Sequence, residues 1–103
     1  AMTAHILYKK IDNKNCATHS AIIIKKIIRK KIGYKGIIIS DDISMKSLKQ
    51  DITQNALKAL RAGCNLALYC KGSSKESLKL LKKIPNIDEF TRKKTSEFYK
   101  FLR

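Results

Sequence analysis

The run of three isoleucines at positions 37–39, with Gly36 before it and Ser40 after it, constrains the fold more than any other feature. Consecutive β-branched residues favour an extended strand, and a strand without polar positions has to be buried on both faces. Strands of that kind occur in parallel sheets that helices cover on both sides. The run therefore predicts a central strand over residues 36–40 of an α/β protein.

Other strands and amphipathic helices are expected to alternate with this strand along the chain. The expected elements are a strand over 2–7, a helix over 20–31, the strand over 36–40, a helix over 51–62, a strand over 65–70, a helix from 74 or 77 to just before Pro85, and a helical tail over 86–103. The connections are too long for hairpins, which indicates parallel strands joined by right-handed crossovers. Three such units could form a small α/β layer or the last three-eighths of a barrel.

The chain is strongly basic, with 23 Lys plus Arg against 8 Asp plus Glu and a net charge of +15 over 103 residues. Such a charge attracts polyanions non-specifically at low salt. The basic residues are mainly lysines spread over every segment, whereas a dedicated nucleic-acid interface favours clustered arginines or interleaved aromatics. We therefore interpret the lysines as solvated helix faces and expect no specific nucleic-acid partner. No apolar run approaches the roughly 20 residues of a membrane span, so no membrane association is expected.

The three cysteines, Cys16, Cys64 and Cys70, form an odd set without a Cys-x-x-Cys pair. Zinc ligation would require closer spacing and nearby histidines, whereas the two histidines lie far from Cys64 and Cys70 in the sequence. We expect small buried thiols in a reducing, cytoplasmic compartment, with no metal and no cofactor.

Chemistry in parallel α/β proteins gathers where the strands end. Asp41 and Asp42 follow the isoleucine run directly, and His5 lies near the end of the first expected strand. An Asp at such a place can simply cap the following turn, or it can act as a nucleophile. A retaining glycosidase uses one carboxylate as nucleophile and a second group as acid/base, about 5 Å apart. A Ser-His-Asp triad is less well supported, because Ser40 lacks the Gly-x-Ser-x-Gly elbow.

Residues 27–44 read IIRKKIGYKGIIISDDIS, and this stretch resembles the active-site signature of glycoside hydrolase family 3. Three further segments, MTAHI at 2–6, SDDISM at 40–45 and ALRAGCNL at 59–66, resemble the bacterial β-N-acetylhexosaminidase branch of that family. The resemblance implies that 1–103 is a partial catalytic domain of a TIM (β/α)8 barrel, from its sixth strand to its eighth helix. The helical tail over 86–103 follows that region.

The resemblance also implies an activity and a set of site residues. The family member would be a retaining enzyme that removes terminal β-linked N-acetylglucosamine from peptidoglycan-derived muropeptides in the cytoplasm. Its nucleophile would be Asp41, and Asp42 would be a neighbouring carboxylate that serves loop geometry or hydrogen bonding. His5 and Met45 would bind substrate near the mouth of the sugar pocket, although His5 is equally compatible with a structural role.

The departures from the family pattern concern the rest of the catalytic machinery. The family's KHFPGHG substrate-binding segment and its Asp/His acid/base lie upstream of this region and have no counterpart in the chain. Cys16 and His19 replace the Pro and Leu of a PATLS loop, and Asn65 replaces an Asp. We therefore expect the chain alone to be almost inert, with an N-acetylglucosamine-containing glycan and the missing amino-terminal part of the barrel as its partners. Two alternatives stay open: a catalytically inactive basic α/β module that binds anionic polymers or a partner protein, and a stand-alone α/β domain.

Overall fold

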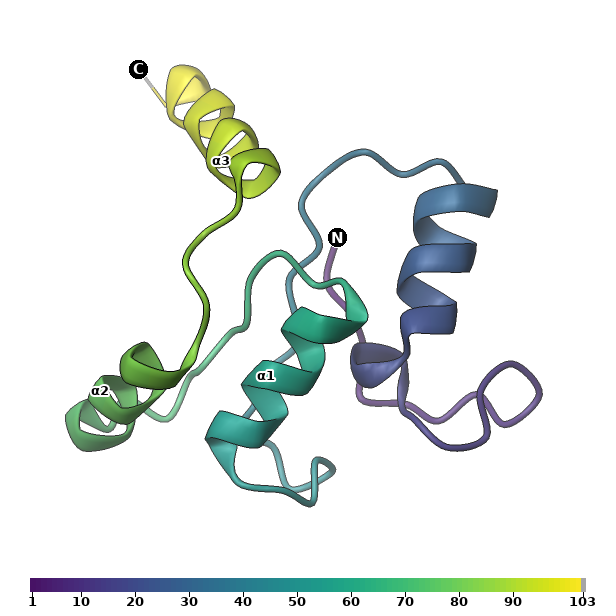
Figure 1. Ribbon diagram of the computed structural model, residues 1–103, viewed down its shortest axis with the longest axis horizontal. Coiled ribbons are helices and arrows are strands. Elements are labelled where there is room, and N and C mark those ends of the chain that lie inside the picture. Colours follow the sequence, from purple (N-terminus) through teal and green to yellow (C-terminus); the bar gives the residue numbers. More distant parts are fainter. Residues whose placement is uncertain (103) are drawn as a thin grey trace.

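The structure is a computed structural model that describes residues 1–102. In this part of the chain the helical elements are the 3-10 turn η1 (Ala17–His19), the π-helix η2 (Ile22–Lys31), and the α-helices α1 (Ile52–Ala62), α2 (Ser74–Lys83) and α3 (Glu89–Phe101) (Figure 1). The helices expected from apolar spacing therefore form within two residues of their predicted starts, and α3 lies within the expected tail. Arg103, the last residue of that tail, lies outside the described residues. None of the described helices is long and apolar enough to cross a bilayer.

The predicted parallel sheet is wrong, because no strand forms in the part of the chain that the structure describes. The segments expected as strands meet only through two isolated parallel bridges, which join Ile39 to Met2 on one side and to Leu66 on the other. The expected α/β class, with three βα units of a TIM barrel, is therefore replaced by a helical arrangement in which three irregular segments meet at Ile39.

Side-chain oxygens occupy the hydrogen-bonding positions that would have extended the bridge between Ile39 and Leu66 into a pair of strands. Asn65 Oδ1 accepts from the Ile38 N–H at 2.8 Å, and Ser40 Oγ accepts from the Leu68 N–H at 2.9 Å. A backbone group that already has such a partner is unavailable to a neighbouring segment. Regular pairing between the isoleucine segment and residues 65–70 therefore stops at the bridge between Ile39 and Leu66.

The ends of two helices follow from specific residues. Ser20 precedes η2, and its Oγ accepts from the Ile23 N–H at 3.1 Å while donating to Asp12 Oδ2 at 2.7 Å. Gly63 ends α1 with φ of +121°, a conformation that costs little without a side chain. A Cβ at Gly63 would lie 2.8 Å from Ile24 Cγ2, so the glycine also allows η2 to approach closely.

Helix α1 lies between η2 on one side and α2 on the other (Figure 1), and it contacts η1, η2 and α2. Two clusters of buried side chains lie around it: Ile24, Ile38, Ala59, Ala62 and Cys64 form the first, and Ile43, Leu48, Ala56 and Leu80 form the second. Helix α3 lies apart from α1 and α2 in Figure 1. Asn65 Nδ2 donates to Thr91 Oγ1 at 3.0 Å, and the Arg29 guanidinium lies 5.3 Å from the centre of the Phe90 ring. These contacts attach α3 to the rest of the molecule.

Candidate active site

The side chains of residues 37–41 alternate between buried and partly exposed positions. Ile38 and Ser40 have no exposed surface, whereas Ile39 and Asp41 are partly exposed. Alternate residues of extended backbone point to opposite sides. Asp41 therefore shares the accessible side of this segment with Ile37 and Ile39.

Asp42 is held on several sides and in turn contacts Asp41. The Asp42 N–H donates to Asp41 Oδ1 at 2.8 Å. Within the described residues, this is the only hydrogen bond that the Asp41 carboxylate receives. The Asp42 carboxylate accepts from Ser44 Oγ at 2.6 Å, from Ser44 N at 3.0 Å and from Cys70 N at 3.0 Å. These donors, the Ser44 hydroxyl above all, lower the pKa of Asp42. Asp42 is thus an ionised, fixed neighbour of Asp41.

His5 connects this loop to the turn η1 (Ala17–His19). Its Nε2 lies 2.8 Å from the carbonyl oxygen of Asp42, and its Nδ1 lies 2.8 Å from Thr18 Oγ1. Thr18 Oγ1 also lies 2.9 Å from Thr3 Oγ1 and 3.1 Å from the Ala4 carbonyl oxygen. Both ring nitrogens of His5 therefore have protein partners. The substrate-binding role expected for His5 stays a prediction, and a sugar would have to displace one of these bonds.

Within the described residues, neither Met45 nor His19 forms a hydrogen bond with the Asp41 carboxylate. Met45 is 42% exposed, and its backbone N–H donates to the Asp42 carbonyl at 3.2 Å. Its predicted contact with substrate stays a prediction. His19 Nε2 donates to the Asn55 carbonyl at 3.2 Å, and burial lowers the pKa of His19. His19 therefore bonds to α1 and not to the loop that carries Asp41.

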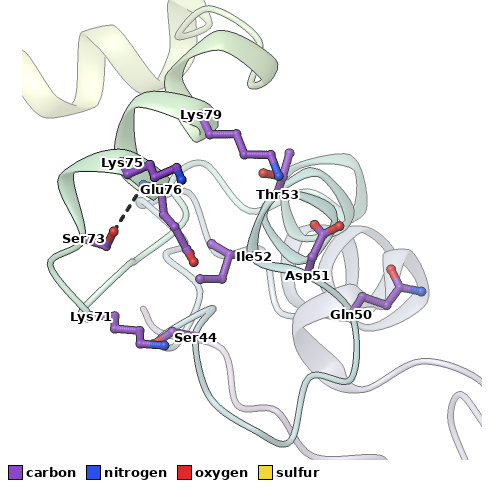
Figure 2. A pocket seen from close by; sticks show the side chains of 10 residues that line it. All are labelled: Ser44, Gln50, Asp51, Ile52, Thr53, Lys71, Ser73, Lys75, Glu76 and Lys79. Carbon is purple, nitrogen blue, oxygen red and sulfur yellow. Dashed lines mark hydrogen bonds between the residues drawn. The ribbon is translucent and has the colours of Figure 1, made fainter.

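A pocket of about 580 Å³ adjoins this loop (Figure 2). It lies between the amino-terminal ends of α1 and α2, and its walls carry charges of both signs. The lining residues are Ser44, Gln50, Asp51, Ile52, Thr53, Lys71, Ser73, Lys75, Glu76 and Lys79. Ser44 alone belongs to both the pocket and the Asp42 contacts. Since neither Asp41 nor His5 lines the pocket, it does not hold the predicted nucleophile.

A second hollow, which we call the apolar groove, lies between α3 and the bridged segments and has a volume of about 350 Å³. Its lining residues are Ile37, Ile39, Leu66, Thr95, Phe98, Tyr99 and Leu102. Ile39 precedes Asp41 by two residues, so the groove and the Asp41 carboxylate open on the same side of segment 37–41. Phe98 and Tyr99 are 69% and 68% exposed, which leaves the groove uncovered by the described residues.

Sequence reasoning missed four residues that fix the site: Thr3, Thr18, Ser44 and Cys70. Two of them carried a usable signal. Thr3 is two residues before His5, which is the spacing of side chains on one side of an extended segment. Asp42 and Ser44 have the spacing of an Asx turn, in which the Asp side chain accepts from the backbone N–H two residues later. The links to Thr18 and Cys70 cross long stretches of sequence and left no local pattern.

Comparisons with known proteins bear on what these residues do. The model of the family described as "Glycosyl hydrolase family 3 N terminal domain" matches residues 1–97. The chain belongs to glycosyl hydrolase family 3. The β-hexosaminidase of Methylobacillus flagellatus is 43% identical over 76 residues, and that of Nitrosomonas eutropha is 41% identical over 71 residues. The matches cover 72% and 67% of this family member but only 22% and 20% of the two relatives.

Solved structures give a consistent result for this family member. CbsA from Thermotoga neapolitana superposes with a TM-score of 0.82 at 27% identity, over 99% of this chain and 26% of CbsA. NagZ from Neisseria gonorrhoeae, in complex with N-trifluoroacetyl-D-glucosamine, gives 0.72 at 29% identity over 85% of this chain and 26% of NagZ. The β-N-acetylglucosaminidase from Thermotoga maritima gives 0.68 at 33% identity, over 80% of this chain and 19% of that enzyme. The chain thus corresponds to about a quarter or less of each enzyme.

Proposed function

We propose that this chain carries the nucleophile, Asp41, of a retaining β-N-acetylhexosaminidase. The observation that carries the proposal is the state of the Asp41 side chain. Its carboxylate is partly exposed, forms no ion pair with the described residues and receives a single hydrogen bond, from the Asp42 N–H. A nucleophilic carboxylate has to be fixed in direction and still free at one oxygen, and Asp41 meets both conditions.

In the proposed reaction, the free oxygen of Asp41 attacks the anomeric carbon of the sugar. The glycosidic C–O bond breaks, and an acid protonates the departing oxygen. Water, deprotonated by the same group, then attacks the anomeric carbon and breaks the ester bond to Asp41. The carboxylate is regenerated, and two inversions at the anomeric carbon give net retention.

The proposed substrate is a terminal β-linked N-acetylglucosamine residue of a peptidoglycan-derived muropeptide. The β-N-acetylglucosaminidase of Thermotoga maritima and the sugar derivative bound to NagZ support the N-acetylglucosamine part of this proposal. A reducing, cytoplasmic location is part of the same proposal. The free state of Cys16, Cys64 and Cys70 supports that location.

We propose that the partner is the part of a family 3 β-hexosaminidase that lies outside the matched segment, in the same polypeptide or in a second one. The curated relatives are several times longer than the region they share with this chain, which matches 22% and 20% of them. The uncovered apolar groove opens on the side of Asp41 and gives this partner an apolar surface to cover. A partner seated there would be adjacent to Asp41 and could supply the acid/base.

The test combines the 103-residue chain with the remaining part of the Methylobacillus flagellatus β-hexosaminidase by co-expression. Hydrolysis of 4-nitrophenyl N-acetyl-β-D-glucosaminide is measured for the chain alone and for the combination. We expect almost no turnover from the chain alone and clear turnover from the combination. Asp41→Asn should abolish that turnover. Asp51→Asn is the matched control, because Asn also caps helices well and Asp51 caps α1 away from Asp41.

Three outcomes would each contradict a part of the proposal. Equal turnover in the wild type and in Asp41→Asn would exclude Asp41 as the nucleophile. A stable complex without turnover would contradict the activity, and salt-dependent binding of a polyanion by the same chain would then favour the basic binding module. Turnover by the chain alone would show that it supplies its own acid/base and needs no partner.

A further inference from the structure

We propose that His5 is a positioning residue that fixes the Asp41 carboxylate through Asp42. This inference rests on the proposed role of Asp41 as the nucleophile. It assigns His5 to the support of the reacting group in place of direct contact with the sugar. The chain of contacts runs from a buried threonine, through His5 and Asp42, to Asp41.

Asp42 transmits the constraint because its two neighbouring peptide groups and its side chain are all bonded. Its carbonyl oxygen accepts from His5 Nε2, and its carboxylate accepts from Ser44 and from the Cys70 N–H. Peptide groups are planar, so a residue fixed at its carbonyl and at its side chain retains little rotational freedom. The remaining group, the Asp42 N–H, therefore points steadily at Asp41 Oδ1, 2.8 Å away.

The other end of the chain of contacts is anchored in the interior. Thr18 has no exposed surface, and its hydroxyl lies within hydrogen-bonding distance of Thr3 Oγ1 and the Ala4 carbonyl. Thr3 is also buried, and its N–H donates at 2.9 Å to the carbonyl of Ile39, the last residue of the isoleucine run. His5 thus connects the loop of Asp41 to a buried part of the fold.

The hydrogen positions required by this arrangement are consistent. A carbonyl oxygen only accepts, so Nε2 of His5 carries a proton and donates it to Asp42. Thr18 has a single hydroxyl proton, which lies between two acceptors, the Ala4 carbonyl at 3.1 Å and, in neutral His5, Nδ1 at 2.8 Å, and the Thr3 hydroxyl can donate to Thr18. The Asp42 carbonyl also accepts from the Met45 N–H at 3.2 Å, and the one donor that His5 adds is its Nε2 proton at 2.8 Å. Gln, whose amide nitrogen can occupy nearly the place of Nε2, should replace it.

The experiment measures amide hydrogen exchange by NMR in the full 103-residue chain, where no turnover is required. The variants are His5→Ala, His5→Gln and, as a matched control, His19→Ala, which removes a histidine bonded to a different backbone carbonyl. We expect the Asp42 amide to exchange about tenfold faster in His5→Ala, near the wild-type rate in His5→Gln, and unchanged in His19→Ala. Core amides such as that of Ala59 should keep their protection in every variant.

A second measurement needs no substitution and so does not depend on whether a variant folds. Scalar coupling across the hydrogen bond between His5 Nε2 and the Asp42 carbonyl carbon should be detectable in the wild type. Absence of this coupling would overturn the proposal, and so would wild-type exchange at the Asp42 amide in His5→Ala. Equal acceleration at Asp42 and in the core would show that His5 merely supports the fold. Failure of the proposed glycosidase activity would leave these NMR results unchanged, so the two failures are distinguishable.

Discussion

Replacement of Asn65 by Ala should destabilise the fold strongly, because one amide side chain holds three parts of the molecule together. Asn65 Oδ1 accepts from the Ile38 N–H at 2.8 Å and from Arg29 Nη2 at 2.7 Å. Its Nδ2 donates to Thr91 Oγ1 at 3.0 Å. The side chain therefore joins η2, the isoleucine segment and α3.

The magnitude follows from what each partner loses. Ile38 has no exposed surface, so its N–H would be left buried without an acceptor, at a cost of about 1–3 kcal/mol. The Thr91 bond contributes about 0.5–1.5 kcal/mol. Arg29 keeps its bonds to the carbonyls of Tyr34 and Gly36, so the loss of its bond to Asn65 adds little to the destabilisation. We expect a total loss of about 2–4 kcal/mol in the free energy of unfolding, a large share of the roughly 5–15 kcal/mol typical of a domain.

Urea unfolding followed by circular dichroism measures this loss, and Asn65→Asp is the matched control. A carboxylate at this position keeps both acceptor bonds and can accept from the Thr91 hydroxyl, so its stability should stay within about 1 kcal/mol of the wild type. Hydrogen exchange at the Ile38 amide should accelerate in Asn65→Ala alone. A loss below about 0.5 kcal/mol in Asn65→Ala, or equal losses in both variants, would refute the reasoning.

Three further predictions concern titratable groups. Ser44→Ala should raise the pKa of Asp42 toward its ordinary value, because the Ser44 hydroxyl is the main cause of its lowering; an NMR titration that shows no rise would exclude that cause. Hydrogen bonds, with Ser20 first, lower the pKa of Asp12 from 3.8 to about 2. Asp12 should therefore add stability that is fully present above pH 3.8 and is lost as the pH falls toward 2, and Asp12→Asn should flatten this part of the curve of melting temperature against pH. Burial raises the pKa of the Cys64 thiol to about 11, whereas Cys70 is exposed. Iodoacetamide at pH 8 should modify Cys70 well before Cys64 in a mass-spectrometric time course, and the reverse order would contradict this placement.

The helices were predictable from the sequence because their signals are local. Apolar spacing indicated η2 and α1, and the structure buries Ile24 of η2 and Ala56 of α1. The sheet was not predictable in the same way. Pattern reasoning counts apolar residues in a segment, whereas the pairing with residues 65–70 is ended by backbone N–H groups that donate to the side-chain oxygens of Asn65 and Ser40. The spacing of apolar residues does not indicate which side chains form those hydrogen bonds.

For the candidate site, too, the local features were predictable from the sequence and the long-range contacts were not. The end of the isoleucine run marked Asp41 and Asp42, because polar residues directly after a buried run are visible in the sequence. The contact of His5 with Asp42 joins residues 37 positions apart, and no periodicity encodes it. Long-range hydrogen bonds of this kind become visible only when the fold brings their partners together.

The distribution of these contacts along the chain bears on how the proposed enzyme would work. The groups that contact Asp41, directly or through Asp42 and His5, come from residues between Thr3 and Cys70 of the described segment. The acid/base and the sugar pocket would have to come from the rest of a family 3 enzyme. A partner would then need only to place its acid/base about 5 Å from a carboxylate that is already fixed. On this argument the affinity of the partner for the apolar groove, and not the ordering of Asp41, would limit the activity of the combination.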